Sequence, residues 1–379
     1  MKITIFTLIW VVLASAVHYS SDRIDLSARP AAMGGAFVGV ADDLNALEWN
    51  PAGLSNATGL EVGVLKYRKL FDHISHDNVY QFGIDFLKPI AIHKKNSFAS
   101  VSPGQKPVFG MPRLSVGAGI NYLGSDVFNQ LIVLAGMSLR IIEHGIDSSL
   151  CSHTNYSRNA LSLGIVVKYI RFGYSPGNFF GVEEGDPILS GIGSTSALTI
   201  NAGLFGRIRQ LRLGVIARNL IEPNMAFQDT PFGKLPASIQ AGFSCPLFED
   251  HDRALLLLAY DYEYFSEKIN HEIDDYFHLG LEMDLSGPLH ILRLFDGFYL
   301  RAGMVGENPA SSQLKWLTYG FGFNFNLPSA FKLDNWILKF DGFYGDPRQI
   351  ISDINNFYFS ISIQRRPCEK LDVKINKYK

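Results

Sequence analysis

The strongest constraint on the fold is a period of two in hydrophobicity, which recurs in short segments along most of the chain. Lys315–Asn326 shows it plainly, because every second residue is apolar and the residues between are mostly small or polar. The apolar set is Leu317, Tyr319, Phe321, Phe323 and Phe325, and the other set is Trp316, Thr318, Gly320, Gly322, Asn324 and Asn326. Successive side chains of a strand point to opposite faces, so this pattern predicts a strand with one apolar face.

Fourteen segments carry this alternation, and turn-rich stretches separate them. They are Glu61–Tyr67, Tyr80–Lys88, Arg113–Tyr122, Leu131–Arg140, Leu161–Ile170, Ala197–Phe205, Leu211–Asn219, Pro236–Leu247, Leu255–Tyr264, Tyr276–Asp284, Phe298–Met304, Lys315–Asn326, Trp336–Tyr344 and Asn356–Gln364. The sequence predicts no helix of ten residues or more, apart from a short possibility around Ala41–Trp49. An all-β protein is therefore expected.

Composition agrees with strands and restricts the partners. Many of the 35 glycines lie inside apolar runs, where a helix would lose about 1 kcal/mol for each one. Charged residues make up only 18% of the chain and aromatic residues 13%. The formal net charge is −2, without basic blocks, which argues against a nucleic acid as the main partner.

Two architectures can bury or cover such strands. A soluble sandwich packs the apolar faces of two sheets together, whereas an outer-membrane barrel turns them toward lipid. Segments of about ten residues match the tilted span of a bilayer, and aromatic residues gather near the segment ends, as in interfacial girdles. The sequence therefore predicts a transmembrane antiparallel β-barrel of about 14 strands, with the sandwich as the alternative.

The chain ends suggest export and a division into four parts. Lys2 precedes an apolar run from Ile3 to Leu13, and Ala14-Ser15-Ala16 has the form of a signal-peptidase site. We expect residues 1–16 to be a cleaved signal peptide, residues 17–58 an N-terminal segment, residues 59–364 the barrel and residues 365–379 a polar tail. The predicted location is the bacterial outer membrane.

Motifs for chemistry are largely missing. The sequence has no nucleophile elbow, zinc-protease motif or phosphate loop, so we expect no enzyme and no cofactor. His73 and His76 could bind a metal, but no third ligand accompanies them, and a polar turn is the favoured interpretation. A disulfide between Cys151 and Cys368 stays open.

The run from Leu26 to Leu54 does not read as a strand. It holds a small-residue stretch, an acidic pair and an Asn-Pro turn signal. The residues concerned are Gly34, Gly35, Ala36, Ala41, Asp42, Asp43, Asn50, Pro51, Ala52, Gly53 and Leu54. This ordered set resembles the hatch of the FadL/TodX-type outer-membrane transporters of hydrophobic compounds, including their PorV-like branch. Further stretches resemble strand motifs of that branch: Val167–Ile170, Gly214–Leu220, Leu235–Pro236 and Tyr299–Gly303.

The resemblance implies a monomeric barrel with a hatch, or plug, in its lumen. It also implies passive uptake of hydrophobic small molecules such as long-chain fatty acids, gated by the hatch. Outer-membrane lipids and the barrel-assembly machinery would be its other partners. The polar tail departs from barrels that end on a terminal aromatic residue, and no ligand pocket can be matched residue by residue. We expect Gly34, Gly35, Ala36, Asp42, Asp43, Asn50, Pro51, Ala52 and Gly53 to form the gate.

Charged residues on the polar side of the strands are candidates for the lumen. They are Arg113, Lys168, Arg212, Arg218, Arg301 and Glu282. A cation facing lipid would cost about 2–4 kcal/mol at the midplane, so these cations should point inward. There they could pair with Asp42 and Asp43 and pin the hatch, or they could hold a fatty-acid carboxylate.

Two alternative functions stay open at this point. The chain could be a PorV-like scaffold or attachment protein for exported proteins, or it could be a structural barrel on the cell surface.

Overall fold

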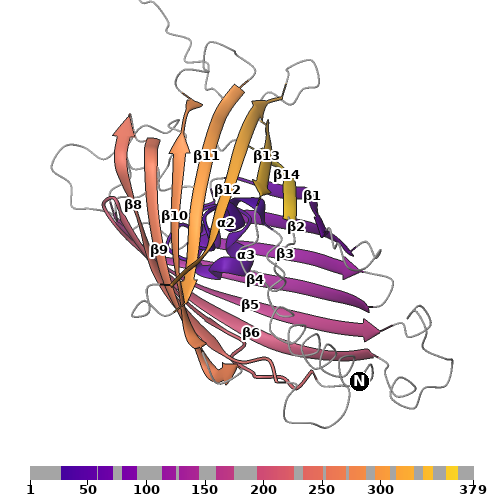
Figure 1. Cartoon of the computed structure of the whole chain (residues 1–379). Coiled ribbons are helices and arrows are strands. Elements are labelled where there is room, and N and C mark those ends of the chain that lie inside the picture. The colour runs from indigo at the N-terminus through magenta and orange to yellow at the C-terminus, as the bar shows by residue number, and fades with distance from the viewer. Residues whose placement is uncertain are drawn as a thin grey trace, which may run out of the picture.

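The computed structural model describes residues 27–57, 59–70, 79–91, 113–124, 128–144, 159–174, 194–225, 234–250, 253–269, 273–286, 295–307, 313–327, 336–344 and 356–365. In this part of the chain, fourteen antiparallel strands close into one barrel (Figure 1). Each strand pairs with its neighbours in sequence, and β1 closes the ring by pairing with β14. The predicted barrel of about 14 strands is confirmed, and the sandwich alternative is wrong.

Each of the fourteen alternating segments overlaps one strand, and only Asn219, Pro236 and Ala237 of these segments lie outside the strands. The strands are β1 (Glu61–Leu70), β2 (Val79–Ala91), β3 (Arg113–Gly124), β4 (Phe128–His144), β5 (Asn159–Tyr174), β6 (Ser194–Ile208), β7 (Leu211–Arg218), β8 (Ser238–Asp250), β9 (Arg253–Ile269), β10 (Ile273–Asp284), β11 (Phe295–Glu307), β12 (Gln313–Asn326), β13 (Trp336–Tyr344) and β14 (Asn356–Arg365). The alternation in hydrophobicity therefore predicted the positions of all fourteen strands.

The two faces of the wall differ as the alternation predicts. Leu317 and Tyr319 of β12 are 59% and 53% exposed, whereas Thr318 between them is fully buried. Large apolar side chains are likewise exposed on the outer face of many other strands, among them Ile84, Ile120, Met137, Leu163, Leu204, Val215, Ile239 and Leu300. The outside is thus an apolar surface suited to lipid, and buried polar side chains face the lumen. In the described residues, no helix has the length and hydropathy to cross a bilayer.

The N-terminal segment, residues 27–57, lies inside the barrel (Figure 1). It consists of two short helices, α2 (Ala28–Ala32) and α3 (Ala46–Trp49), and the 3₁₀ helix η1 (Pro51–Asn56). The short helix expected around Ala41–Trp49 is thus present only in its last four residues. Asn50 caps η1 by accepting a hydrogen bond from the Ala52 N–H (3.2 Å), and Pro51 occupies the first position, which suits its fixed φ.

Gly34 and Gly35 turn the chain sharply after α2. Their φ values are 64° and 80°, a left-handed region that costs other residues about 1–2 kcal/mol. A Cβ on Gly34 would also lie only 2.7 Å from the Met304 backbone nitrogen of β11. Conformation and lack of space therefore both require glycine where the sequence shows the Gly-Gly pair.

The outer parts of the predicted division are not covered by the structure. Residues 1–26 and 366–379 lie outside the described residues, so the signal peptide and the polar tail stay predictions. Described strands run from Glu61 to Arg365, and the two ends of this stretch meet where the Arg365 N–H donates to the Leu60 carbonyl (2.8 Å).

Candidate functional site

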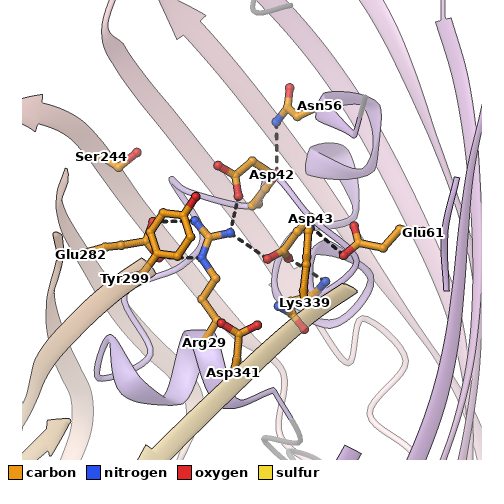
Figure 2. A network of polar contacts seen from close by, with 12 residues as sticks. Arg29, Asp42, Asp43, Asn56, Glu61, Ser244, Glu282, Tyr299, Lys339 and Asp341 are labelled. Carbon is orange, nitrogen blue, oxygen red and sulfur yellow. Dashed lines mark hydrogen bonds and ion pairs between the residues drawn. The ribbon is translucent and has the colours of Figure 1, made fainter. Parts of the chain in front are cut away.

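Arg29 of α2 organises the acidic side of the lumen. Its Nη1 lies 2.7 Å from Asp42 Oδ1 and 2.7 Å from Asp43 Oδ2, both in the same N-terminal segment. Its Nε and Nη2 donate to the two carboxylate oxygens of Glu282 on β10, at 2.8 and 2.9 Å. Figure 2 shows the guanidinium placed between the three carboxylates. One cation thus joins α2, the acidic pair and the wall, in the bidentate geometry that makes such contacts strong.

The wall extends this network on both sides. Arg301 of β11 lies 2.6 Å from Glu282 and 2.6 Å from Asp341 of β13. Arg212 of β7 reaches the second oxygen of Asp42, at 3.1 Å. We call this network of Arg29, Asp42, Asp43, Arg212, Glu282, Arg301 and Asp341, with the strands β9–β14 that carry most of its wall members, the charged sector.

The two adjacent aspartates differ electrostatically. Burial alone would raise the pKa of Asp42, but Arg29 and Arg212 outweigh it and lower that pKa below its ordinary value. Burial raises the pKa of Asp43, because Arg29 opposes it only in part and the neighbouring Glu61 and Asp42 add to it. The ion pairs of Asp42 therefore favour its charged form, whereas the ion pair of Asp43 offsets the cost of burying its charge only in part.

A second charged contact lies beside Asp43, where the barrel closes. Lys339 of β13 donates to Glu61 Oε1 of β1 at 3.0 Å, and Ser362 of β14 donates to the same oxygen at 3.2 Å. Glu61 is only 2% exposed. These bonds connect three neighbouring strands on the lumen side of the β1–β14 junction.

Strands β8–β10 hold the backbone of the turn that follows α2. Asp261 Oδ2 of β9 accepts hydrogen bonds from the backbone N–H groups of Phe37 and Val38, both at 2.8 Å. Ser244 of β8 donates to the Gly39 carbonyl (2.8 Å), and Nδ1 of His278 on β10 lies 2.7 Å from the Gly34 carbonyl. Wall side chains therefore satisfy backbone groups that would otherwise be buried without partners.

Strands β4–β6 hold η1 in a similar way. Asn50 Nδ2 donates to the Leu204 carbonyl of β6 (3.1 Å), and Ser55 Oγ donates to Ser162 Oγ of β5 (2.7 Å). Ser138 of β4 donates to the Ala52 carbonyl at 2.8 Å. Arg140 of β4 donates to the Ser55 carbonyl and to the Asn56 side chain.

A large apolar cluster lies on the side of β2–β6, next to buried polar and charged side chains such as Asp85, Arg140 and Lys168. There the N-terminal segment and inward-facing wall residues form one buried cluster, which also takes in part of the β7–β8 connection. From the segment come Ala41, Leu44, Ala46, Leu47, Ala52, Leu54 and Ala57; from the wall Leu87, Ile132, Leu134, Val166, Ile170, Phe172 and Phe205; and from the connection Met225 and Leu235. We call this cluster, with strands β2–β6, the apolar sector. Inward-facing residues of a transmembrane barrel are usually polar, so its composition is unusual.

Glycines in the strands let the backbone of the N-terminal segment touch the wall. A Cβ on Gly280 or Gly303 would overlap the backbone at Met33 or Gly34, and one on Gly214 would overlap the Val38 carbonyl. A Cβ on Gly164 would overlap the backbone of Pro51 and Ala52, and one on Gly203 would overlap the Asn50 side chain. These five glycines are therefore explained by the close approach of the N-terminal segment to the wall.

The predicted residues are distributed as follows. Gly34, Gly35, Ala36, Asn50, Pro51, Ala52 and Gly53 are fully buried against the wall or against one another, and Asp42 and Asp43 lie in the charged sector. Lys168, Arg212, Arg218, Arg301 and Glu282 are buried on the inward faces of their strands. The Arg113 side chain lies outside the described residues. Their predicted roles in gating stay predictions.

Sequence reasoning missed Arg29 and Asp261 as central residues. A charge at position 29 inside a run of small apolar residues was an available signal. Asp261 lies on the polar side of its strand in the sequence, but nothing in the sequence indicated its partners, which are backbone N–H groups of a distant segment. In the described residues, no group of three His, Cys, Asp or Glu could hold a metal. His73, His76, Cys151 and Cys368 lie outside them.

Comparisons with known proteins find a partial match to a secretion-system family and a structural similarity to hydrocarbon channels. The family model described as type IX secretion system membrane protein PorP/SprF matches residues 131–281, less than half of the chain. No curated protein sequence matches the chain significantly. Among solved structures, a deltaS2 mutant of the TodX monoaromatic hydrocarbon channel is similar at 12% identity, with 90% of this chain and 100% of that chain covered and a TM-score of 0.52.

Two further solved structures are similar at lower scores. The CymD monoaromatic hydrocarbon channel has 11% identity, 90% and 97% coverage of this and that chain, and a TM-score of 0.47. A Pseudomonas aeruginosa FadL homologue has 11% identity, 89% and 98% coverage, and a TM-score of 0.45. At 12% identity the TodX likeness concerns the fold. The closed barrel and its apolar exterior make the chain a bacterial outer-membrane β-barrel, and its fold is similar to that of the TodX channel structure.

Proposed function

We propose that the protein is an outer-membrane channel for passive uptake of hydrophobic small molecules such as long-chain fatty acids, with residues 27–57 as its gating hatch. The observation that carries the proposal is the apolar sector. The wall of a water-filled pore is usually polar, whereas Ile132, Val166 and Ile170 face inward on two adjacent strands of this barrel. A passage for apolar molecules needs such a lining, because apolar contact supplies their affinity.

The position of the hatch fits a gate. Its Leu44, Leu47 and Leu54 cover the inward-facing apolar wall, so the lining is buried while the hatch is in place. The Arg29 network holds the other side of the hatch to β10. A displacement of the hatch away from β2–β6 would uncover an apolar path, while the gradient of the compound would supply the direction.

The test is uptake by the protein reconstituted into lipid vesicles, with a fluorescent long-chain fatty acid as the probe. A Val166→Thr/Ile170→Thr variant makes the apolar lining polar while keeping the β-branched shapes, and we expect saturable uptake to fall at least tenfold. Val305→Thr is the matched control, since Val305 is equally buried on the inner face of β11, outside the apolar sector. Equal uptake by all three proteins would contradict a channel that uses this lining.

A second candidate function follows from the family comparison. The PorP/SprF model covers residues 131–281, which span most of β4 to β10, and it favours a scaffold for exported proteins. Stable co-purification of an exported protein, without fatty-acid uptake by the reconstituted barrel, would favour this reading over the channel.

A further inference from the structure

We propose that a free strand edge at one rim of the barrel, residues 194–198 of β6, binds an extended segment of an exported protein by strand addition. This inference rests on the second candidate function, the scaffold for exported proteins, and names the surface and the chemistry of the contact. It is independent of the channel. The edge lies within residues 131–281, the stretch that the PorP/SprF family model matches.

At this rim β6 extends past its neighbour β7. The last pair between the two strands is Ala202 with Ala217, and β7 ends at Arg218. β6 runs eight residues further, to Ser194, and pairs with β5 along this whole stretch. In the described residues, the end of β6 therefore has a strand on one side only.

The connection that follows β7 covers only the first part of this extension. Asn219 has a φ of 51°, which turns the chain at the end of β7. The Leu220 N–H still donates to the Ile200 carbonyl (3.0 Å), and the Thr199 hydroxyl donates to the Ile221 carbonyl (2.9 Å). In residues 219–225 and 234–237, no backbone hydrogen bond reaches residues 194–198. We call residues 194–198 the free edge.

Three residues of the free edge present backbone groups to a partner. Successive residues of an antiparallel strand direct their backbone groups to alternate sides. Since the Ile200 carbonyl faces the β7 side, the N–H and C=O groups of Ser194, Ser196 and Leu198 face that side as well. Residues 195 and 197 point the other way and belong to the ladder with β5.

The free edge lacks the residues that usually protect an open strand. Proteins blunt such edges with charged residues or proline, because an uncovered ladder invites another strand. Residues 194–198 read Ser-Thr-Ser-Ala-Leu, without charge or proline. Other strands that extend past a neighbour carry charges in the extension, namely Glu143 in β4, Glu249 and Asp250 in β8, Glu267 and Lys268 in β9, and Lys315 in β12.

The free edge begins where the apolar band of the outer wall ends. Leu198 and Ile208, at the two ends of the outward apolar row of β6, are 57% and 60% exposed. Ser194 and Ser196 continue the same outward row as exposed polar residues. Unpaired backbone groups are costly in hydrocarbon, and this change from apolar to polar places the free edge at the aqueous rim. A partner in water can therefore reach it.

The chemistry of the free edge selects its partner. Alternating N–H and C=O groups are complementary to another extended backbone, whereas a fatty acid or a lipid tail cannot pair with them. Leu198, Leu220 and Ile221 lie beside the edge and are all more than half exposed, so they can receive apolar side chains from alternate residues of the partner. The match to a secretion-system family makes an exported protein the source of this segment.

A synthetic peptide tests strand addition on the purified barrel in detergent. The probe copies residues 166–173 of β5, which pair with this stretch of β6 in the barrel, and carries a dye for fluorescence anisotropy. We expect Ser196→Pro to weaken binding at least tenfold, because proline removes the N–H that faces the partner. Ser196→Ala is the matched control and should bind like wild type, since it keeps that N–H. Equal binding by the two variants, or none by wild type, would overturn strand addition.

Unfolding in urea shows whether the edge is free before a partner binds. Proline is tolerated where the N–H of a strand has no ladder partner, so Ser196→Pro should keep the midpoint of wild type. Ala197→Pro removes an N–H on the β5 side and should lower the midpoint. An equally lowered midpoint for Ser196→Pro would show that this N–H is already paired within the barrel and would refute the free edge.

Cross-linking in the parent bacterium tests the occupant. A photoreactive phenylalanine analogue at position 196 should form an adduct with one exported protein. The analogue at position 204, which faces outward where β7 covers β6, should form none. A peptide of the cross-linked segment should bind the purified barrel, and methylation of alternate backbone nitrogens should abolish binding in one of the two registers.

Two outcomes of this experiment separate the inference from the scaffold function. Binding that survives methylation in both registers would refute strand addition and leave the scaffold intact. No adduct at position 196, although the β5 peptide binds, would refute the exported partner. Fatty-acid uptake by Ser196→Pro should equal that of wild type in either case, because position 196 lies outside the apolar sector.

Discussion

The charged sector and the apolar sector hold opposite sides of one buried segment by different physics. In the charged sector, carboxylates at 2.7–2.9 Å fix Arg29. Even a small displacement would therefore leave buried charges without their ion-pair partners. In the apolar sector, Leu44 and Leu47 rest on Ile132 and its neighbours, and such contacts have no direction. An apolar ligand can replace the second kind of contact but not the first. The charged sector is thus suited to anchor the N-terminal segment, whereas the contacts of the apolar sector are easier to break.

The largest expected effect comes from removing the central cation. Arg29→Met leaves three carboxylates without their shared partner, and we expect the free energy of unfolding to fall by about 3–5 kcal/mol. Conductance in planar bilayers should rise, because the anchor is lost. Arg209→Met at the exposed β6–β7 turn is the control and should change neither quantity. An unaltered urea midpoint for Arg29→Met would show that the charged sector is no anchor.

The apolar side should respond next. Leu47→Ala removes a side chain that is 1% exposed, and we expect a loss of about 3 kcal/mol of unfolding free energy. Leu317→Ala, on the lipid-facing side at 59% exposure, should lose far less in the same urea titration. Fatty-acid uptake should survive Leu47→Ala, because Leu47 belongs to the N-terminal segment and not to the wall lining proposed to contact the ligand. Loss of uptake would mean that Leu47 has a role beyond covering the wall.

The acidic pair allows a finer comparison within the charged sector. Asp42→Asn removes the partner of both Arg29 and Arg212, and we expect it to cost about 2 kcal/mol. Asp43→Asn should cost much less, because burial raises the pKa of Asp43 and its charged form is already disfavoured. Thermal unfolding of the two variants side by side measures the difference. Equal losses would contradict the unequal compensation of these neighbours.

The smallest effect concerns pH. The pKa of Asp42 is lowered in the folded protein, so its stabilising contribution is present above its unfolded value of about 3.9 and is lost as the pH falls below it. The raised pKa of Asp43 acts oppositely, since stability increases as the pH falls from neutral toward about 3.9. Between neutral pH and about pH 4, the Asp43→Asn protein should therefore gain less stability than wild type.

Denaturant titrations at neutral pH, about pH 5 and about pH 3 check this sign. We expect the Asp42→Asn protein to gain stability between neutral pH and about pH 4, because of the two aspartates only Asp43 then remains to titrate. Identical pH profiles for the two variants would show that neither aspartate is perturbed in the folded protein.

Residues of the barrel wall could be predicted because their signal is local. Leu317, Thr318 and Tyr319 alternate within three positions of the chain, and the structure places them outside, inside and outside. The wall contacts that hold the N-terminal segment could not be predicted in this way. Asp261 binds the N–H groups of Phe37 and Val38, more than 200 positions away, and an acidic residue on the polar side of a strand does not reveal which backbone it meets.

The sequence by itself determined the antiparallel barrel, its fourteen strands and which face of each strand meets lipid, since one period of two repeated along the chain admits few other folds. Only the tertiary structure decided that Arg29 joins Asp42, Asp43 and Glu282, and that residues of β2, β4, β5 and β6 form one apolar cluster with the N-terminal segment. Closure of the sheet brings β10 and β4 to opposite sides of one buried segment. Contacts between such distant parts of the chain depend on this closure and leave no periodic trace in the sequence.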